Sequence, residues 1–272
     1  MIVFPTAKLN FGLRITAKRN DGYHNIETVF YPVGLCDALE FVISDKAVNK
    51  DFLITTGINT GSDPEDNLVI KTLRKLREKY TFPLLRIHLH KVIPAGAGLG
   101  GGSSDSACLL KSVNRRFELN ISEQELRDIS MELGSDCPFF IEGVPAYASG
   151  RGELLIPVTH FLSGLYLVLL NPGVEINTRE AYQNCRPEQP SESLILLITH
   201  SNNVWRKQIL NDFEDFAFKK YPVIEEIKNE LYDTGALFCL MSGSGSSVYG
   251  IFRQKPELPE KLKEFMIFEG EM

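Results

Sequence analysis

The chain has 272 residues, of which 43% are hydrophobic and 24% charged. This length and composition predict one large or two modest folded domains, and they exclude a disordered, collagen-like or coiled-coil chain. The net charge of −6 excludes a general attraction to nucleic acid or to anionic lipid. Any anionic ligand must therefore be held by local groups.

No segment has the character of a membrane span or a leader peptide. The longest apolar stretch, around Leu165–Leu170, is far shorter than the about 20 residues that a membrane helix requires. The first residues lack the basic segment and the cleavage site of a signal peptide, so we expect a cytoplasmic protein. Five widely spaced cysteines without a Cys-x-x-Cys pair indicate free thiols rather than disulfides or a zinc site.

The first element is predicted to be a half-buried strand, because residues 7–16 alternate between apolar and other side chains. Lys8 and Asn10 share the face opposite the apolar residues. After a turn at residues 20–22, the stretch Thr28–Val33 and the run Leu39–Ser44 predict further strands in a hairpin or meander. The apolar face of the first strand consists of Ala7, Leu9, Phe11, Leu13 and Ile15.

Helical spacing begins after this meander. Val69, Leu73, Leu76 and Tyr80 recur at intervals of three and four residues, and Asp66 is a candidate N-cap for their helix. The basic residues on its other face are typical of a solvated helix surface.

A strand, a loop and a helix follow in that order. Residues 85–89 alternate as in a strand, residues 94–102 are glycine-rich, and helical spacing resumes near Ser103. A further helix opens at the capping box Ser122-x-x-Glu125 and closes at Gly134. Asp136 is therefore expected just beyond a helix end.

The second half reads as another α+β unit. Leu165–Leu170 predicts a strand, a helix runs from Pro222 to Gly235, and two short strands, 237–241 and 247–252, flank the loop 242–246. We therefore predict an N-terminal domain of residues 1–155 and a C-terminal domain of residues 156–272.

The strongest chemical signal is the glycine-rich stretch, in which five of the seven residues from Gly96 to Gly102 are glycine. Glycine permits positive φ and has no Cβ, so consecutive amides can converge on one anion, and the following helix adds the positive end of its dipole. A glycine-rich turn needed only for packing is the alternative, but each glycine costs about 0.5–1 kcal/mol relative to alanine. The stretch predicts a polyphosphate site.

Better-known phosphate loops do not fit. Residues 96–101 match G-x-G-x-x-G, yet no acidic residue ends a following strand about 20 residues later, as a dinucleotide fold requires. The lysine of a P-loop is absent, and the chain contains neither H-R-D nor D-F-G of protein kinases.

Three motifs in order resemble those of the small-molecule kinase family of galactokinase, homoserine kinase and mevalonate kinase, the GHMP kinases. They are the strand Pro5–Asn10, the stretch from Pro94 to Ala107, and the loop Ser242–Ser246. The resemblance implies an α+β fold of two domains, the first like domain 2 of a ribosomal protein and the second a ferredoxin-like α/β sandwich. It also implies transfer of a phosphate from ATP to an alcohol.

Within that family the chain is most similar to the member whose alcohol carries a cytidine diphosphate. The residues concerned are Arg19–His24, Glu65–Leu68 and Gly134–Phe140. The resemblance implies that Asp136 is the general base and that Lys8 stabilises the charge on the transferred phosphate.

The resemblance also implies the binding residues. Tyr23 and His24 would lie against the cytosine with Tyr182 on its opposite face, Thr178 would be nearby, and Asn10 would bind the erythritol part or its phosphates. Asn67 and Lys91 would lie near the adenosine, Ser104 would contact Mg²⁺, and Cys137 is interpreted as structural. The triphosphate would be held by Pro94, Gly96, Gly98, Leu99, Gly100, Gly101, Gly102, Ser103 and Ser104.

We expect ATP with Mg²⁺ as the cofactor, with no dedicated metal site in the protein. The expected partners are ATP and the cytidine diphosphate substrate, without nucleic acid or membrane, in a monomer or weak homodimer. Two alternatives remain at this point: a family member acting on mevalonate, homoserine or a sugar, and a non-catalytic nucleotide-binding module.

Overall fold

The computed structural model describes residues 1–44, 49–59, 61 and 63–272. Its internal contacts divide the chain into two compact units. Unit 1 contains Met1–Ala7, Leu35–Ala95 and Gly100–Gly143, and unit 2 contains Lys8–Gly34, Gly96–Leu99 and Val144–Met272. This division differs from the predicted boundary after residue 155, because the first long strands make their contacts with the C-terminal half.

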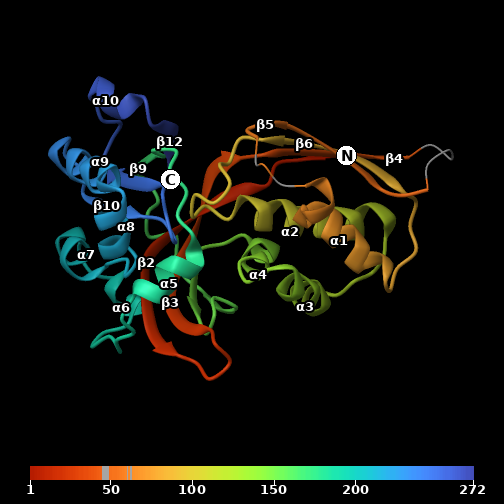
Figure 1. Ribbon diagram of the computed structural model, residues 1–272, viewed down its shortest axis with the longest axis horizontal. Coiled ribbons are helices and arrows are strands. Elements are labelled where there is room, and N and C mark those ends of the chain that lie inside the picture. The colour runs from red at the N-terminus through yellow and green to blue at the C-terminus, as the bar shows by residue number, and fades with distance from the viewer. Residues whose placement is uncertain (45–48, 60, 62) are drawn as a thin grey trace. The chain divides into compact units, whose positions relative to one another are not determined.

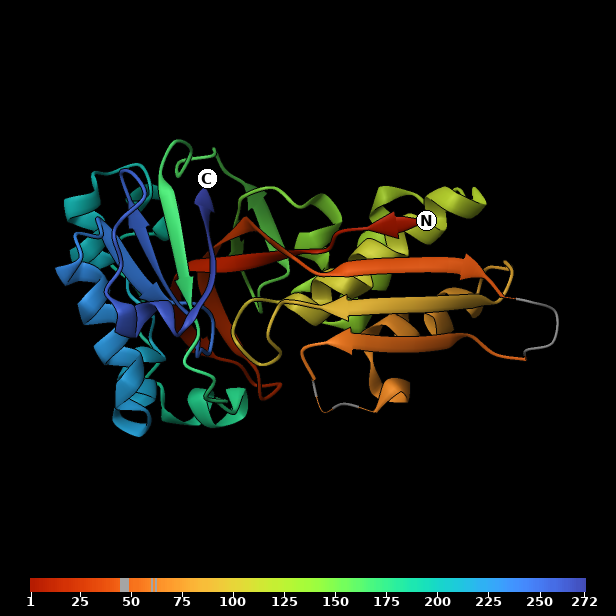
Figure 2. The same cartoon turned by 90° about the horizontal axis from the view of Figure 1, so that it is seen from above.

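Unit 1 is built on a four-stranded sheet in the order β1-β4-β6-β5. The strands are β1 (Ile2–Val3), β4 (Ala38–Ile43), β6 (Leu85–Lys91) and β5 (Phe52–Gly57), and only the β5–β6 pair is parallel. Along β6 buried and exposed residues alternate, which confirms the predicted strand. Helices cover one face of this sheet (Figure 1), and Figure 2 looks onto its other face.

Four helices accompany this sheet: α1 (Leu68–Arg77), α2 (Gly101–Phe117), α3 (Glu123–Leu133) and α4 (Cys137–Glu142). The predicted cap of α1 is wrong by one residue. Asp66 lies inside a short 3₁₀ turn, η1 (Pro64–Asp66), and the extended Asn67 caps α1 by accepting from the Val69 amide at 2.9 Å. Helix α2 begins at Gly101, two residues before the predicted start, and α3 ends before Gly134 as predicted.

Unit 2 contains a first sheet in the order β2-β3-β7-β8. These strands are β2 (Thr6–Lys18), β3 (His24–Cys36), β7 (Ala146–Ser149) and β8 (Leu154–Pro157). The prediction of a half-buried strand is wrong for the first half of β2, since Lys8 is 3% and Asn10 2% exposed. The backbone of this part of β2 hydrogen-bonds to loops from elsewhere in unit 2, and the Lys8 side chain packs over the Phe30 ring.

A second antiparallel sheet of unit 2 has the order β10-β11-β9-β12. It comprises β10 (Phe238–Met241), β11 (Val248–Phe252), β9 (Tyr166–Leu170) and β12 (Met266–Glu271). Helix α9 (Pro222–Asp233) contacts β10 and β11 and buries Ile224, Ile227 and Leu231, as its spacing predicts. The other helices are α5 (Thr178–Asn184), α6 (Leu194–Leu197), α7 (Asn202–Gln208), α8 (Glu214–Lys220) and α10 (Glu260–Lys263).

The content of helices and strands confirms the predicted α+β class. All five cysteines are free thiols. Among the helices of the described ranges, none combines the length and the apolar character that crossing a membrane requires.

Candidate active site

The three sequence motifs meet in one hydrogen-bonded network within unit 2. The Lys8 amide donates to the Leu99 carbonyl at 3.0 Å, which ties β2 to the glycine-rich stretch. The Ser242 hydroxyl accepts from the Asn10 amide at 3.1 Å and donates to the Gly98 carbonyl at 2.9 Å. Residues separated by up to 232 positions are therefore joined through a single buried serine.

Gly98 shows why this junction requires glycine. Its φ is +76°, and a Cβ there would lie 1.9 Å from the Ser242 carbonyl oxygen. Gly243 approaches from the late loop, where a Cβ would lie 3.1 Å from Gly98 Cα. The Asn211 amide closes the late loop by donating to the Met241 and Gly243 carbonyls at 2.8 Å.

Lys8 and Asn10 lie together on β2, as the alternation predicts. The Lys8 ammonium donates to Asn10 Oδ1 and lies 5.0 Å from the centre of the Phe30 ring. Asn10 Nδ2 donates to the Thr28 hydroxyl at 3.0 Å, and the Tyr249 hydroxyl donates to the Asn10 carbonyl at 3.0 Å. A buried lysine whose neighbours fix its ammonium is suited to electrostatic catalysis.

In unit 1, the start of α2 presents the arrangement expected of a phosphate site. Gly100 is the N-cap with φ +71°, and no side chain caps the helix. The first amides of a helix have no partner within the helix, and the dipole of a 17-residue helix adds to their attraction for an anion. Gly102 is exposed and Ser103 partly exposed, whereas Ser104 is buried.

The burial of Ser104 bears on the predicted magnesium contact. Ser104 is 2% exposed, so the partly exposed Ser103 is the better placed hydroxyl for a bound ion. No group of three or more His, Cys, Asp or Glu residues suited to a metal ion occurs within the described part of the chain.

Asp136 lies between two helices, just past the end of α3 and directly before α4, where it occupies the N-cap position without capping through its side chain. Its neighbour Cys137 is fully buried against Ser103 and Ser106, whose hydroxyls interact with the thiol, and burial raises the pKa of Cys137 to about 11. Such a thiol is protonated near neutral pH and is no nucleophile. Cys137 therefore serves to join Asp136 to the first turns of α2.

The structure gives Lys91 two partners within unit 1. Its ammonium is buried and binds the carboxylates of Asp37 and Asp105, and its place near the adenosine stays a prediction. Asn67 is partly buried and its side-chain oxygen caps α1. The two residues predicted near the adenosine thus both have structural partners in unit 1.

At the predicted cytosine end, His24 and Tyr182 lie together. Their rings stack with centres 5.0 Å apart and planes inclined by 18°, and Tyr182 packs edge-on against Phe213. Rings stacked directly on each other leave no room for a base between them, so a base must stack on an outer face or displace one ring. Burial, followed by the nearby Lys18 ammonium, lowers the pKa of His24, which favours a neutral ring near pH 7.

Tyr23 and Thr178 have other surroundings. Tyr23 is 51% exposed, and the Arg151 guanidinium lies 3.7 Å from the centre of its ring. The Thr178 hydroxyl, at the start of α5, lies 3.0 Å from the Ser244 hydroxyl of the late loop. Thr178 is therefore linked to the third motif, while Tyr23 is stacked by a residue that sequence reasoning missed.

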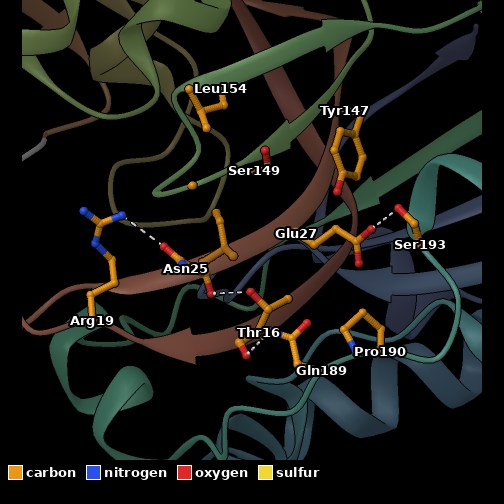
Figure 3. A pocket seen from close by; sticks show the side chains of 12 residues that line it. Thr16, Arg19, Asn25, Glu27, Tyr147, Ser149, Leu154, Gln189, Pro190 and Ser193 are labelled. Atoms are coloured by element: carbon orange, nitrogen blue, oxygen red, sulfur yellow. Dashed lines mark hydrogen bonds between the residues drawn. The ribbon is translucent and has the colours of Figure 1, made fainter.

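A pocket of about 560 Å³ in unit 2 (Figure 3) has in its lining Arg19, the first residue of the Arg19–His24 motif. Glu27, Tyr147 and Ser193 line it, and none of the predicted site residues does. Glu27 accepts from the Ser193 hydroxyl and from the Leu194 amide at 2.7 Å, so its carboxylate anchors the chain before α6 to β3. We assign no catalytic role to this pocket.

The sequence reasoning also missed the residues that support the site. Thr28, Asn211 and Tyr249 hold Asn10 and the late loop, and Asp37 and Asp105 hold Lys91. Only Asp105 carried a sequence signal, because it directly follows the glycine-serine motif.

Two family models match this chain. Residues 67–144 match the GHMP kinases N terminal domain, and residues 194–270 match the GHMP kinases C terminal domain.

Similar proteins extend over nearly the whole chain. A protein of Bacteroides thetaiotaomicron named 4-diphosphocytidyl-2-C-methyl-D-erythritol kinase is 49% identical over 96% of this chain and 95% of its own length. A Parabacteroides distasonis protein of the same name is 46% identical, with 100% of both chains covered.

Solved structures of kinases have a similar fold. A crystal structure of 4-(cytidine 5'-diphospho)-2C-methyl-D-erythritol kinase superposes with a TM-score of 0.76 and 31% identity, covering 92% of this chain and 90% of that one. The phosphomevalonate kinase of Streptococcus pneumoniae shares only the fold, with a TM-score of 0.69 at 11% identity and full coverage of both chains.

Proposed function

Because the chain belongs to the GHMP kinase family, we propose that it transfers the γ-phosphate of ATP to the 2-hydroxyl group of 4-diphosphocytidyl-2-C-methyl-D-erythritol. This reaction is a step of the non-mevalonate route to isoprenoid precursors. The observation that carries the proposal is the network in which Lys8, Asn10, Gly98 and Ser242 are joined, because it brings the three family motifs together. The names of the relatives support the choice of substrate.

In the proposed reaction Asp136 accepts the proton of the attacking hydroxyl. Phosphoryl transfer depends on positioning and on stabilising charge more than on covalent chemistry. Lys8 supplies positive charge to the transferred phosphate, and Asn10, which accepts from the Lys8 ammonium, fixes its direction. The pairing of Lys8 with Asp136 stays a prediction.

The ATP phosphates are proposed to bind the amides from Gly100 to Ser103, at the start of α2. Mg²⁺ bound with the nucleotide would neutralise phosphate charge, and Ser103 is the protein hydroxyl that we propose for it. The anion is thus held by main-chain groups and a helix dipole, which explains how a chain of net charge −6 can bind it.

The cytosine is proposed to lie against the ring pair of His24 and Tyr182, with Tyr23 at its edge. Stacking on an aromatic ring contributes about 1–3 kcal/mol per base. A neutral His24 ring can both donate to and accept from a pyrimidine edge.

The proposal is tested by measuring ADP release from Mg-ATP with four alcohols: diphosphocytidyl methylerythritol, mevalonate, homoserine and galactose. We expect turnover with the cytidine compound alone. Turnover with one of the other alcohols would assign a different family activity, and ATP binding without any turnover would indicate a non-catalytic module. The cytoplasmic location and the oligomeric state stay predictions.

The general base is tested by the substitution Asp136→Asn, which preserves shape and removes the proton acceptor. We expect turnover to fall by about 10²–10⁴ with little change in Mg-ATP affinity. Turnover equal to that of the wild type would remove Asp136 from the mechanism.

A further inference from the structure

Lys91, at the end of β6, lies in a buried ionic cluster with Asp37 and Asp105. Its side chain is 5% exposed, and the two aspartates are 0% and 2% exposed. The Lys91 ammonium donates to Asp37 Oδ2 and, at 2.8 Å, to Asp105 Oδ2. One ammonium thus joins two carboxylates from distant parts of unit 1, and we call these three residues the Lys91 cluster.

The Lys91 cluster holds both ends of the glycine-rich stretch. Asp37, between β3 and β4, accepts from the amides of Val92 at 2.5 Å and Ile93 at 2.9 Å, directly before Pro94. Asp105 lies in the second turn of α2, one residue after Ser104. The segment that enters the stretch and the helix that leaves it are therefore fixed to the same ammonium.

Gly101 shows how closely the two ends approach each other. A Cβ at Gly101 would lie 2.9 Å from Ile93 Cγ2 and 3.3 Å from Lys91 Nζ. The first helical residue of α2 is thus pressed against the incoming strand, beside the ammonium. A shift of the ionic contact would move the first turn of the helix and its amides.

The Lys91 cluster contains features that lower the stability of the folded protein. Two carboxylates face one ammonium, and Asp105 Oδ1 is buried without a hydrogen-bond partner in the described part of the chain. Burial, the largest cause, and the adjacent Asp37 raise the pKa of Asp105 to about 7. A buried group of this kind costs free energy, and such costs are retained where function requires them.

We propose that Asp105 and Lys91 are positioning residues, which fix the first turn of α2 against the incoming strand and so align its amides for the phosphates of ATP. This inference rests on the proposed function, because it assigns the same phosphate site. It gives Lys91, which was predicted near the adenosine, a role in positioning the phosphate site.

The test uses two substitutions of one residue. Asp105→Leu removes the tie to Lys91 together with the unpartnered buried oxygen, and it leaves Lys91 paired with Asp37. Asp105→Asn keeps an oxygen that can accept from Lys91. A dissociation constant for Mg-ATP, measured by calorimetry, and a melting temperature are obtained for each full-length variant.

We expect Asp105→Leu to keep or raise the melting temperature while weakening Mg-ATP binding about tenfold, equivalent to one misaligned hydrogen bond of about 1.4 kcal/mol. Asp105→Asn should restore most of the affinity. Opposite changes in stability and affinity distinguish positioning from a purely structural role. Wild-type affinity in a folded Asp105→Leu protein would overturn the inference; if that variant does not fold, Asp105→Ala decides in the same way.

The matched control is Arg77→Met, which breaks another ion pair of unit 1, to Asp51 at 2.8 Å. It should lower the melting temperature and leave Mg-ATP affinity unchanged. A loss of affinity equal to that of Asp105→Leu would show that any destabilisation weakens binding, and would overturn the inference.

Binding of Mg-ATP to the wild-type protein separates the proposed function from the positioning role. Absence of Mg-ATP binding in the wild type contradicts the proposed function, whereas binding that Asp105→Leu leaves intact contradicts only the positioning role.

Discussion

The two glycine-rich segments, 94–102 and 242–246, use glycine for different physical reasons. Gly98 and Gly243 lie where the two segments contact each other, and a Cβ on either would come within 3.1 Å of backbone atoms of the other segment. Gly102, at the start of α2, is exposed, and a Cβ there would meet only Leu68 Cδ1, at 3.7 Å. Packing does not require glycine at position 102, and our proposal gives the reason as the close approach of a phosphate.

This contrast separates the glycines that join the two loops from the glycines at which we propose that the ligand binds. The late loop shapes the middle of the first segment through Ser242 and Gly243. The end of the first segment offers helix amides to an anion. A single motif can therefore contain both kinds of glycine, and substitution with alanine distinguishes them.

The largest effect is expected for Gly98→Ala. The added methyl group would lie 1.9 Å from the Ser242 carbonyl oxygen at a positive φ, so the two loops must separate. A displacement of about 1 Å in a catalytic site can cost about 10²-fold in rate, and we expect at least that loss in kcat/KM for ATP together with a lower melting temperature. Wild-type values of both would show that the junction is not needed.

Ser242→Ala should act mainly on stability. Ser242 is fully buried, and its removal leaves the Asn10 amide and the Gly98 carbonyl without their partner. Buried unsatisfied groups cost about 1–3 kcal/mol each. Urea unfolding measures this loss as a decrease in the free energy of unfolding. The control is Ser247→Ala, which removes a buried hydroxyl that makes one hydrogen bond, to Asn171. A smaller loss of unfolding free energy for Ser242→Ala than for Ser247→Ala would contradict the role of Ser242 in joining the two loops.

Gly102→Ala should separate binding from folding. Alanine favours a helix over glycine by about 1 kcal/mol, so the melting temperature should stay or rise. If phosphate approaches the backbone closely here, Mg-ATP affinity should fall about tenfold, or about 1.4 kcal/mol. Unchanged affinity would show that the ligand does not approach this residue.

The smallest effect concerns pH, and it distinguishes the titratable Asp105 beside the first segment from the Ser242 hydroxyl of the late loop, which does not titrate. Asp105 has a pKa raised from 3.8 to about 7, so the folded protein holds this proton in a range where the unfolded chain has lost it. Stability from this group is therefore lost as pH rises from about 4 to about 7, with a slope of at most about 1.4 kcal/mol per pH unit.

Urea unfolding of the wild type and of Asp105→Asn between pH 5 and pH 8 measures this slope. The variant should gain stability relative to the wild type up to about pH 7 and no more above it. The effect of Ser242→Ala should not vary with pH, because no titrating group is removed. Parallel curves for the wild type and Asp105→Asn would contradict the raised pKa of Asp105.

The sequence allowed the main elements and the motif residues to be predicted, because these depend on local patterns. The alternation along β6 and the spacing in α9 led to correct elements. Lys8 and Asn10 were placed on one face by the alternation of β2, and Gly98 and Ser242 were placed in motifs.

What the sequence could not show depends on contacts between distant residues. Both faces of early β2 are buried, and its Asn10 amide hydrogen-bonds to a loop residue 232 positions away. The partners of Lys91 lie 54 and 14 positions from it, and no local pattern distinguishes a lysine bound to two aspartates from one that contacts a ligand. Asn67 capped α1 instead of Asp66 because a preceding 3₁₀ turn used Asp66, a difference of one residue that spacing does not determine.

The most direct test of the central claim is a nuclear magnetic resonance measurement on protein labelled with ¹⁵N-glycine, titrated with a non-hydrolysable Mg-ATP analogue. The chain has 21 glycines, and single alanine substitutions assign the signals of interest. We expect the largest amide proton shifts at Gly100, Gly101 and Gly102, exceeding that of Gly243. Shifts centred on other glycines, with these three unmoved, would contradict it.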